Sequence, residues 1–310
     1  MLLRWIGLCA AGGCLSCALL PSAAQSALQR SVNQAMGGKR GTAIVLAVDA
    51  GQILAAYHLD VAARRRAFPG SSIKPFTLMA LLERQAVDAH TSWVCKRPLN
   101  IAGHRLDCSH PATGQPLDAA AALAYSCNSY FTSLATRLTP AQLQESLIED
   151  GFASATGLAP AEAAGNVALA ASRDELQLQA IGDWGVQVTP LELLHAYRHV
   201  ALRARGSGSP ELAPVFDGLA GSTGYGMARL AQPDGNVRVA GKTGTANSDE
   251  GQWTHGWFAG YAPAETPEFV LVVFLEHGRG SDAADVARHI FGALGANEKA
   301  KPSLTAGRKP

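Results

Sequence analysis

Ser71 and Lys74 stand three residues apart at the predicted start of a helix, and together they could carry out nucleophilic acyl transfer. A serine hydroxyl is a weak nucleophile until a neighbouring base takes its proton. Positions i and i+3 share one face of a helix, so the Lys74 amine can reach Ser71 Oγ. Shielding from water near another cation lowers the pKa of a lysine and makes it a usable base. The pair therefore predicts a covalent acyl-enzyme mechanism.

A serine and a lysine at this spacing occur by chance in many chains, so the pair alone is not evidence of function. Two later segments make the interpretation specific. Ser126-Cys127-Asn128 follows the pair, and Lys242-Thr243-Gly244-Thr245 follows in turn. These three elements, in this order, mark penicillin-binding proteins and class A β-lactamases. The chain therefore resembles the serine enzymes that act on D-alanyl peptides and β-lactams.

The resemblance extends beyond the three motifs and covers residues 42–292. Residues 69–76 read P-G-S-S-I-K-P-F and are similar to the P-G-S-x-x-K-P-F of penicillin-binding transpeptidases. Residues 188–193 (V-T-P-L-E-L) resemble their V-T-P-L-Q-L stretch, and residues 240–246 (A-G-K-T-G-T-A) resemble their third motif. Residues 183–185 (D-W-G) depart from the G-Q-G usually seen before V-T-P-L. This departure leaves the acylation residues untouched.

The resemblance implies a role for each residue of the first two motifs. Ser71 is the nucleophile, Lys74 is its base, and Ser126 passes a proton to the leaving amine. Asn128 holds the amide of the substrate, because a carboxamide both donates and accepts hydrogen bonds. The backbone N–H groups of Ser71 and Thr245 bind the developing oxyanion. Together these groups form a complete acyl-transfer site.

The third motif supplies the substrate-binding strand by the same resemblance. Lys242 tunes the proton relay electrostatically from the edge of the sheet. The hydroxyls of Thr243 and Thr245 bind the carboxylate of the substrate. Gly244 has no side chain, which lets the acyl donor lie against the strand. This chemistry needs neither a metal ion nor an organic cofactor.

The implied activity is that of a serine D,D-transpeptidase or D,D-carboxypeptidase. Its substrates are the D-Ala-D-Ala ends of peptidoglycan stem peptides, and β-lactams are its inhibitors. A β-lactamase is the first alternative, because Glu162 and Asn166 resemble the pair that positions the deacylating water in class A enzymes. The same segment also resembles the T-G-x and E-x-x-G stretch of transpeptidases, whose glutamate is not catalytic. A non-catalytic penicillin sensor or cell-wall-binding module is the second alternative, and the intact catalytic residues disfavour it.

Composition and the N-terminal residues indicate how many domains the chain holds and where in the cell this chemistry takes place. The 310 residues are 47% hydrophobic with a net charge of +1, which allows one large domain and gives no basic surface for nucleic acid. Residues 1–24 combine Arg4, an apolar run and small residues before Ala24. This pattern predicts a signal peptide, with an uncleaved membrane anchor as the alternative. We therefore expect export to the periplasm or to the outer face of the cytoplasmic membrane.

Three cysteines follow this leader, an odd number in a compartment that permits disulfides. Cys95 and Cys108 flank a polar loop, and we expect a disulfide between them, with a reduced structural pair as the alternative. A metal site is disfavoured, because His104 and His110 would have to join two cysteines without the usual C-x-x-C spacing. Cys127 then stays free beside the second motif.

Hydrophobic patterning gives the order of the elements. We expect a β-hairpin over 42–48 and 52–58, a helix over 72–86, more helices over 117–138, 141–148, 176–181 and 189–202, strands at the third motif, 254–261 and 268–275, and a helix over 282–294. The fold class is therefore α/β of the α+β kind, an antiparallel sheet from both chain ends with flanking helices and an inserted all-helical lobe. This arrangement resembles the β-lactamase/transpeptidase fold.

The same patterning divides the chain into four parts. Residues 1–24 form the leader, residues 25–41 a polar lead-in, and residues 42–295 the transpeptidase-like domain. Residues 296–310 are polar with lysines and prolines, and we expect them to be disordered.

Overall fold

The computed structural model describes residues 23–206, 210–248 and 251–299. The helices and strands of these residues are, in chain order, α1 (Ala23–Met36), β1 (Gly41–Ala47), β2 (Ile53–Tyr57), α2 (Leu59–Arg64), η1 (Gly70–Ile73), α3 (Lys74–Glu83), β3 (Asn100–Ile101), β4 (His104–Arg105), α4 (Ala119–Ala124), α5 (Asn128–Ala135), α6 (Pro140–Glu149), β5 (Asn166–Val167), α7 (Arg173–Gln179), β6 (Val186–Gln187), α8 (Pro190–Arg205), η2 (Pro210–Leu212), α9 (Ala213–Gly224), η3 (Arg229–Ala231), β7 (Ala240–Asn247), β8 (Thr254–Ala262), β9 (Phe269–Leu275) and α10 (Gly280–Lys299).

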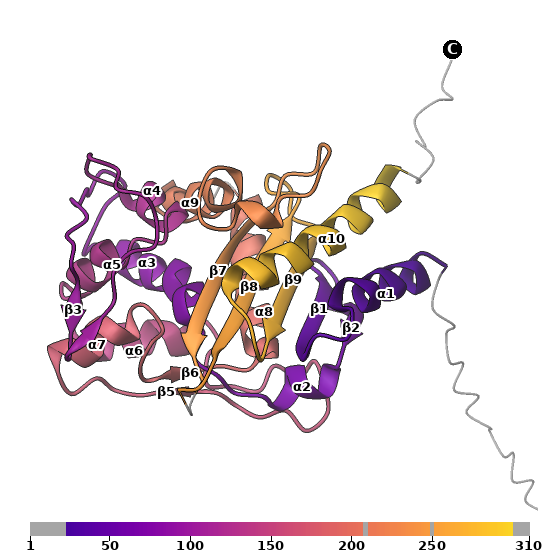
Figure 1. Ribbon diagram of the computed structural model, residues 1–310, viewed down its shortest axis with the longest axis horizontal. Coiled ribbons are helices and arrows are strands. Elements are labelled where there is room, and N and C mark those ends of the chain that lie inside the picture. The colour runs from indigo at the N-terminus through magenta and orange to yellow at the C-terminus, as the bar shows by residue number, and fades with distance from the viewer. Residues whose placement is uncertain (1–22, 207–209, 249–250, 300–310) are drawn as a thin grey trace, which may run out of the picture.

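Strands from both ends of the chain form one antiparallel sheet in the order β2-β1-β9-β8-β7 (Figure 1). β1 and β2 pair as the predicted hairpin, with Ala43 opposite Tyr57. β9 comes from the C-terminal part of the chain and lies between β1 and β8. β7 carries the K-T-G-T motif and pairs with β8 at the edge of the sheet. The expected sheet is confirmed, and it leaves one side of β7 open toward the helical lobe.

The central strand β9 shows how the sequence builds a core on each face of the sheet. Val270, Val272 and Phe274 pack into the core beneath the helical lobe. Leu271 and Val273 pack into the core on the opposite face. Side chains alternate between the faces of a strand, so an unbroken apolar run is buried on both sides. The run of 269–274 therefore forms the predicted central strand.

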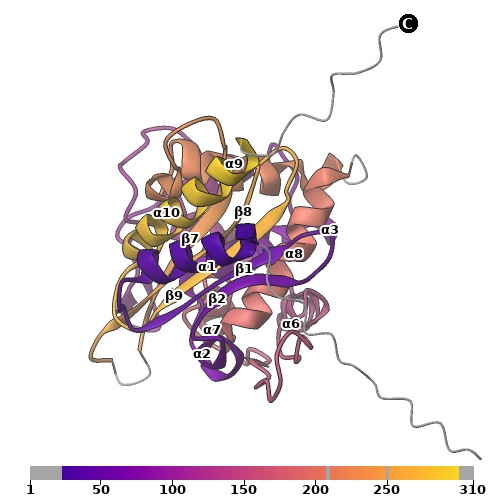
Figure 2. The same ribbon diagram turned by 90° about the vertical axis from the view of Figure 1, so that its right-hand side faces the viewer.

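Helices cover the two faces of the sheet unequally. α1 and α10 lie side by side over one face (Figure 2). The other face packs against α8 and the lobe that contains α3 to α7 and α9 (Figure 1). The inserted helical lobe is therefore confirmed, but it is not all-helical, because it also contains the two-residue strand pairs β3-β4 and β5-β6. The first and second motifs lie in this lobe, and the third lies on the edge strand beside it.

The structure corrects several expected boundaries. The single helix over 117–138 is instead two helices, α4 and α5, separated by a turn at Ser126 and Cys127. The region called a polar lead-in contains the helix α1, whose Leu28, Val32 and Met36 are buried. α9 was not predicted. α10 reaches Lys299, so residues 296–299 continue a helix, whereas 1–22 and 300–310 lie outside the described residues.

The other expected helices are confirmed, with shifted ends. α3 follows a turn of 3₁₀ helix, and Pro75 lies in its first turn, where a proline costs no hydrogen bond. α8 begins with a capping box, in which Thr189 and Glu192 each accept a hydrogen bond from the backbone of the other. Among the described residues, no helix has the length and apolar character needed to cross a membrane.

Candidate active site

The segment that carries Ser71 is fixed by hydrogen bonds to its backbone from three surrounding segments. Trp257 of β8 donates from Nε1 to the carbonyl of Phe68 at 3.0 Å. The Tyr197 hydroxyl of α8 donates to the carbonyl of Ser72 at 3.0 Å. The N–H of Gly70 donates to the carbonyl of Gly182 at 3.1 Å. The Ser71 turn is therefore held rigidly before α3 begins.

Glycines let this segment touch the edge strand directly. A Cβ at Gly244 would lie 2.3 Å from the carbonyl oxygen of Pro69 and 3.0 Å from the amide nitrogen of Ser72. Gly70 has a φ of +51°, and a Cβ there would lie 2.4 Å from the carbonyl oxygen of Thr245. Both positions require glycine on steric grounds. The first and third motifs therefore meet backbone against backbone.

Lys74 is fully buried and reaches across to the second motif. Its Nζ donates to the carbonyl of Ser126 at 2.8 Å, to Ser126 Oγ at 3.2 Å and to Asn128 Oδ1 at 2.5 Å. Burial lowers the pKa of Lys74 to about 8, although the sulfurs of Cys108 and Cys127 and the carboxylate of Asp183 act in the opposite direction. With this pKa, roughly one amine in ten is neutral at pH 7.

Ser126 lies in the turn that interrupts the expected long helix. Its φ is +56°, a left-handed conformation that is unusual outside glycine. The turn is closed by backbone bonds from Ser126 N to Leu123 O at 3.0 Å and from Cys127 N to Ala122 O at 2.9 Å. Because Lys74 binds both the carbonyl and the hydroxyl of Ser126, the strained turn is stabilised by the site itself.

Lys242 approaches the same hydroxyl from the edge strand. Its Nζ donates to Ser126 Oγ at 2.8 Å and to the carbonyl of Thr243 at 3.0 Å. Burial, and then the positive charge of Lys74, hold the pKa of Lys242 well below its ordinary value. Ser126 Oγ therefore accepts hydrogen bonds from two buried amines, and the positive charge of Lys74 disfavours protonation of Lys242.

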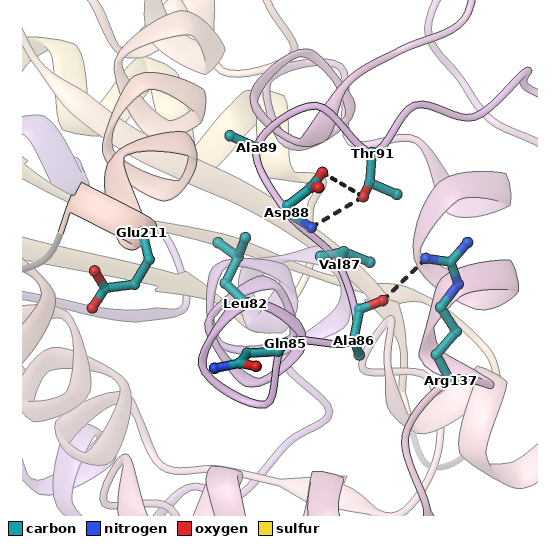
Figure 3. A pocket seen from close by; sticks show the side chains of 9 residues that line it. All are labelled: Leu82, Gln85, Ala86, Val87, Asp88, Ala89, Thr91, Arg137 and Glu211. Carbon is teal, nitrogen blue, oxygen red and sulfur yellow. Dashed lines mark hydrogen bonds between the residues drawn. The ribbon is translucent and has the colours of Figure 1, made fainter.

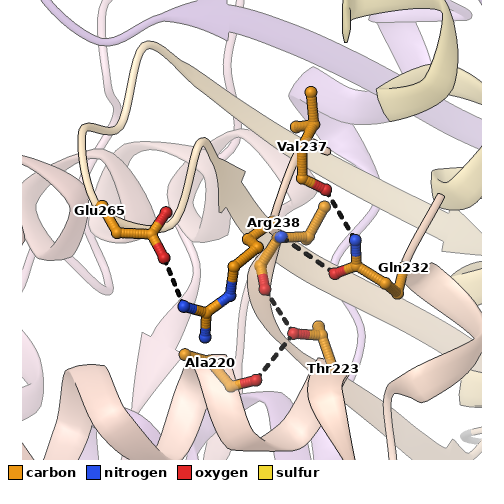
Figure 4. Close-up of polar contacts among 7 residues, drawn as sticks. Ala220, Thr223, Gln232, Val237, Arg238 and Glu265 are labelled. Carbon is orange, nitrogen blue, oxygen red and sulfur yellow. Dashed lines mark hydrogen bonds and ion pairs between the residues drawn. The ribbon is translucent and has the colours of Figure 1, made fainter. Parts of the chain in front are cut away.

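The start of β7 is anchored by a network of polar contacts (Figure 4). The Gln232 side chain donates to the carbonyl of Val237 at 2.6 Å and accepts from the N–H of Val239 at 3.1 Å. Thr223 of α9 donates to the carbonyls of Val239 and Ala220. These bonds fix the strand just before Lys242, which places its amine against the second motif.

The two threonines of the third motif border the first residue of α10. The N–H of Gly280 donates to Thr245 Oγ1 at 2.9 Å, and a Cβ at Gly280 would lie 2.8 Å from Thr243 Cβ. Thr245 Oγ1 already accepts one bond, so its proton can be donated to a ligand. The amino end of a helix favours a negative charge. This corner of the site therefore suits a carboxylate.

Two relations raised by the sequence, that of Ser71 with Lys74 and that of Glu162 with a deacylating water, can be compared with the contacts in the structure. The Ser71 hydroxyl makes no hydrogen bond within the described part of the chain, and the Lys74 amine is directed to the second motif. Glu162 accepts hydrogen bonds from Thr156 N, Thr156 Oγ1 and Ala159 N, at 2.5 to 2.9 Å. Its carboxylate therefore closes its own loop.

Sequence reasoning missed a cluster directly behind the second motif. The disulfide expected between Cys95 and Cys108 is not formed in the structure, where both cysteines are free and their sulfurs lie 3.6 Å apart. Cys127 Sγ lies 3.7 Å from Cys108 Sγ, and His110 Nε2 lies 3.7 Å from Cys95 Sγ. The four ligand atoms all lie within 4.8 Å of one another. The C-x-H spacing of Cys108 and His110 was the available signal, and the fold rather than a C-x-x-C supplies the proximity.

A surface pocket of about 490 Å³ lies beyond the carboxyl end of α3 (Figure 3). It is lined by Leu82, Gln85, Ala86, Val87, Asp88, Ala89, Thr91, Arg137 and Glu211. None of these residues belongs to the three motifs. The candidate site is therefore identified from the converging side chains of the motifs rather than from this pocket.

The antiparallel sheet, the inserted lobe and the two lysines that donate to Ser126 Oγ form the arrangement that the three motifs predicted. A family model for the penicillin binding protein transpeptidase domain matches residues 41–294. The chain therefore belongs to the penicillin-binding protein transpeptidase family.

Curated relatives agree with this assignment. Peptidoglycan D,D-transpeptidase MrdA of Acinetobacter baumannii is 27% identical over 284 residues, which cover 72% of this chain and 41% of that protein. Peptidoglycan D,D-transpeptidase FtsI of Escherichia coli K12 is 25% identical over 325 residues, which cover 87% of this chain and 53% of that protein. The chain thus spans about half the length of these relatives.

Solved structures share the fold at lower identity. The D,D-transpeptidase domain of a peptidoglycan glycosyltransferase from Eggerthella lenta has a TM-score of 0.75 at 23% identity, covering 88% of this chain and 82% of that one. PBP2 of Pseudomonas aeruginosa, solved in complex with WCK 5153, has a TM-score of 0.77 at 20% identity, covering 87% and 77%. The fold class predicted from the sequence is therefore confirmed.

Proposed function

We propose that this protein is a serine D,D-transpeptidase or D,D-carboxypeptidase that acts on the D-Ala-D-Ala ends of peptidoglycan stem peptides. The observation that carries the proposal is the meeting of all three motifs. Lys74 and Lys242 both donate to Ser126 Oγ, and Gly244 packs on the backbone beside Ser71. The relatives named D,D-transpeptidase support the same substrate class.

Acylation uses these groups in order, and it requires the Lys74 amine, which contacts Ser126 and Asn128 in the structure, to reach Ser71 Oγ. Ser71 Oγ attacks the carbonyl carbon of the penultimate D-alanine, and its proton passes to the neutral amine of Lys74. The tetrahedral oxyanion is held by the N–H groups of Ser71 and Thr245. Collapse breaks the peptide bond, and Ser126 gives its proton to the departing D-alanine amine. A proton from a lysine then restores the Ser126 hydroxyl.

The protonation of the two buried lysines explains why both contact the Ser126 hydroxyl. Lys74 must be neutral to act as a base, and burial brings the pKa of its amine to about 8. Each lysine disfavours the charge of the other, so the pair readily holds one proton fewer than two separate lysines. Ser126 Oγ lies within 3.2 Å of both amines. It can therefore pass a proton between Lys74 and the leaving group.

The terminal carboxylate of the substrate is assigned to Thr243 and Thr245. The bond from Gly280 N to Thr245 Oγ1 leaves the Thr245 proton free to donate. The amino end of α10 adds a favourable field for a negative charge. Asn128 binds the amide of the acyl donor through its carboxamide. A β-lactam carries a carboxylate and a strained amide in the same relation, so it acylates Ser71 as a substrate mimic.

Deacylation separates the proposed peptidase from the β-lactamase alternative. Class A hydrolysis would need the Glu162 carboxylate to activate water at the ester. That carboxylate already accepts hydrogen bonds from Thr156 and Ala159 of its own loop. Slow hydrolysis of a β-lactam ester is therefore expected. The natural acyl group is passed either to the amine of a neighbouring peptide strand or to water.

The setting of the reaction is also proposed from its chemistry. Peptidoglycan stem peptides lie outside the cytoplasmic membrane, so the enzyme works in the periplasm or on the outer face of that membrane. The leader predicted for residues 1–24, cleaved or retained as an anchor, would deliver it there. The domain predicted for 42–295 contains every group assigned to the reaction.

The test is the reaction of the full chain with benzylpenicillin, followed by intact mass over hours. We expect one adduct per chain, located on Ser71 by peptide mapping and absent from Ser71→Ala. Ser133→Ala, a half-buried serine of α5 outside the three motifs, serves as the matched control and keeps the adduct. Rapid loss of the adduct with hydrolysed drug would favour the β-lactamase, and no adduct on the folded protein would refute the proposal.

A further inference from the structure

The cysteine and histidine cluster behind the second motif has the composition of a metal site. Its members are Cys95, Cys108, His110 and Cys127, and the last three are at least 93% buried. Three sulfurs and one imidazole nitrogen converge within 4.8 Å. Thiolate and imidazole are the ligands of structural zinc, which binds Cys₃His sets tetrahedrally. The residue types therefore match one chemistry.

The distances match that chemistry as well. Tetrahedral zinc with Zn–S bonds of about 2.3 Å holds neighbouring sulfurs about 3.8 Å apart, and a sulfur and a nitrogen about 3.5 Å apart. The Cys95–Cys108 and Cys108–Cys127 sulfur pairs lie 3.6 and 3.7 Å apart. Cys95 Sγ and His110 Nε2 lie 3.7 Å apart. The cluster thus needs little adjustment to enclose the ion.

Neighbouring polar groups orient His110 and Cys108 as metal ligands. His110 Nδ1 lies 2.7 Å from the carbonyl of Pro111 and 3.2 Å from Arg97 Nη2, and the tautomer with its proton on Nδ1, donated to that carbonyl, leaves Nε2 as the ligand. The N–H of Ser129 donates to Cys108 Sγ at 3.5 Å. Hydrogen bonds of this kind commonly support metal ligands.

Charge is balanced by a neighbouring arginine. Zinc with three thiolates carries one net negative charge, and the Arg97 guanidinium donates to the carbonyl of His110 at 2.7 Å. Arg97 Nη2 also lies 3.3 Å from His110 Nε2, so it must turn away from that nitrogen when metal binds. The carbonyl bond can remain, and the positive charge stays beside the site.

We propose that Cys95, Cys108, His110 and Cys127 bind one Zn²⁺ ion that fastens the 93–110 loop to the second motif. Cys127 lies between Ser126 and Asn128, so the ion would hold the turn that presents both side chains. The same loop already binds this motif once, through Asn128 Nδ2 and the carbonyl of Leu106 at 3.0 Å. The ion positions the motif and takes no part in acyl transfer.

The disulfide predicted from the sequence is the competing state of this cluster. A Cys95–Cys108 bond would bring those sulfurs to about 2.0 Å and remove two of the four ligands. It would leave Cys127 and His110 gathered at the same place without a shared role. Zinc accounts for all four residues, and the two states exclude each other.

The first experiment measures metal directly and does not depend on the proposed activity. The full chain is prepared with reductant and Zn²⁺, dialysed, and analysed for metal by mass spectrometry. We expect one zinc per chain. Replacement by Co²⁺ should give the thiolate-to-cobalt charge-transfer band and the red d–d bands of a tetrahedral thiolate site. An absent metal, a cobalt spectrum without thiolate bands, or a Cys95–Cys108 disulfide persisting in the native protein would overturn the proposal.

Single substitutions then assign the ligands. Cys127→Ser and His110→Gln should weaken zinc binding by more than the roughly 10- to 100-fold typical of an outer contact. His104→Gln, an exposed histidine of β4 in the same loop, is the matched control and should bind zinc like the parent. Circular dichroism checks folding, and the cobalt spectrum of the parent requires no variant. Equal zinc affinity in parent and ligand variants would contradict the assignment.

The positioning role has its own readout, which uses Ser71 acylation as a reporter and so rests on the proposed function. Removal of zinc by a chelator should slow benzylpenicillin acylation by roughly 10- to 100-fold, the size expected from a misplaced catalytic group. Readdition of Zn²⁺ should restore the rate, and His104→Gln should respond like the parent. An unchanged rate on a chain that gains and loses zinc would refute the positioning role while leaving the metal site intact.

Discussion

The two sides of the candidate site, a strand and a loop, are each held in place by different interactions. The strand side, β7, is paired along its length with β8 and anchored by the network of Thr223 and Gln232 (Figure 4). The loop side, residues 93–118 ahead of α4, contains as regular structure the two-residue strands β3 and β4 and depends on side chains. Backbone ladders need no particular side chain, whereas a loop needs specific ones. The strand side is therefore placed by backbone pairing and close steric fit, whereas the loop side is placed by contacts of particular side chains.

The two sides meet at Ser126 Oγ, which accepts from Lys242 and from Lys74, and removal of Lys74 gives the largest expected effect. Lys74→Met keeps an unbranched side chain, shorter by the terminal amine, and removes both the proposed base and the three bonds to Ser126 and Asn128. We expect benzylpenicillin acylation to fall by about 10²- to 10⁴-fold, the size of a lost general base. Stopped-flow or quenched intact-mass kinetics give the rate. Lys96→Met, an exposed lysine, is the control, and an equal loss there would contradict the assignment.

A methyl group on the strand side tests the steric part of the comparison. Gly244→Ala places Cβ 2.3 Å from the Pro69 carbonyl oxygen, so β7 and the Ser71 segment must separate. Overpacking of this kind costs about 1–3 kcal/mol of stability. We expect a lower Tm together with slower acylation. Gly224→Ala has open space around its Cβ and should change neither quantity. Acylation at the parent rate in Gly244→Ala would show that the close contact is not needed.

The pH dependence tests the shared amines. Burial lowers the pKa of Lys74 to about 8, so the neutral base is scarce below that pH and abundant above it. Below the pKa, the acylation rate should rise about tenfold per pH unit, and it should level off above it. Rates measured between pH 6 and pH 10 give the curve. A flat profile would mean that a neutral Lys74 is not the base.

Asp183 gives the smallest expected effect and sharpens the electrostatic part of the comparison. Its carboxylate favours the charged form of Lys74, although burial dominates the pKa of that amine. Asp183→Asn removes this attraction, so the midpoint of the pH curve should move to lower pH. Asp234→Asn, which changes a carboxylate outside the three motifs, should leave the midpoint in place. A shift toward higher pH would contradict the sign of the interaction.

Much of the fold could be predicted because its signals are local. The apolar run at 269–274 and the hairpin around Asp49-Ala50-Gly51 carry their own periodicity and turn residues. The break between α4 and α5 could not be predicted in this way. Alanine and leucine favour a continuous helix there, and the turn at Ser126 is stabilised by Lys74 and Lys242 from distant parts of the chain.

The candidate site shows the same limit. Ser71, Lys74, Ser126 and residues 242–245 follow motifs that can be read along the chain, and the structure brings them together. The Cys₃His cluster has no motif, because its four ligands are gathered by the folding of the 93–127 segment. Proximity of that kind is a property of tertiary structure. The close contact of Gly244 with Pro69 likewise appears only when both segments are placed.

The most direct test of the central claim is D-alanine release from a stem pentapeptide that ends in D-Ala-D-Ala. The full chain is incubated with the peptide, and free D-alanine is measured with and without an acceptor amine. We predict release by the parent, loss of release in Ser71→Ala, and parent-like release in Ser133→Ala. Release that persists in Ser71→Ala, or its absence from a folded parent that reacts with benzylpenicillin, would contradict acyl transfer through Ser71 to this substrate.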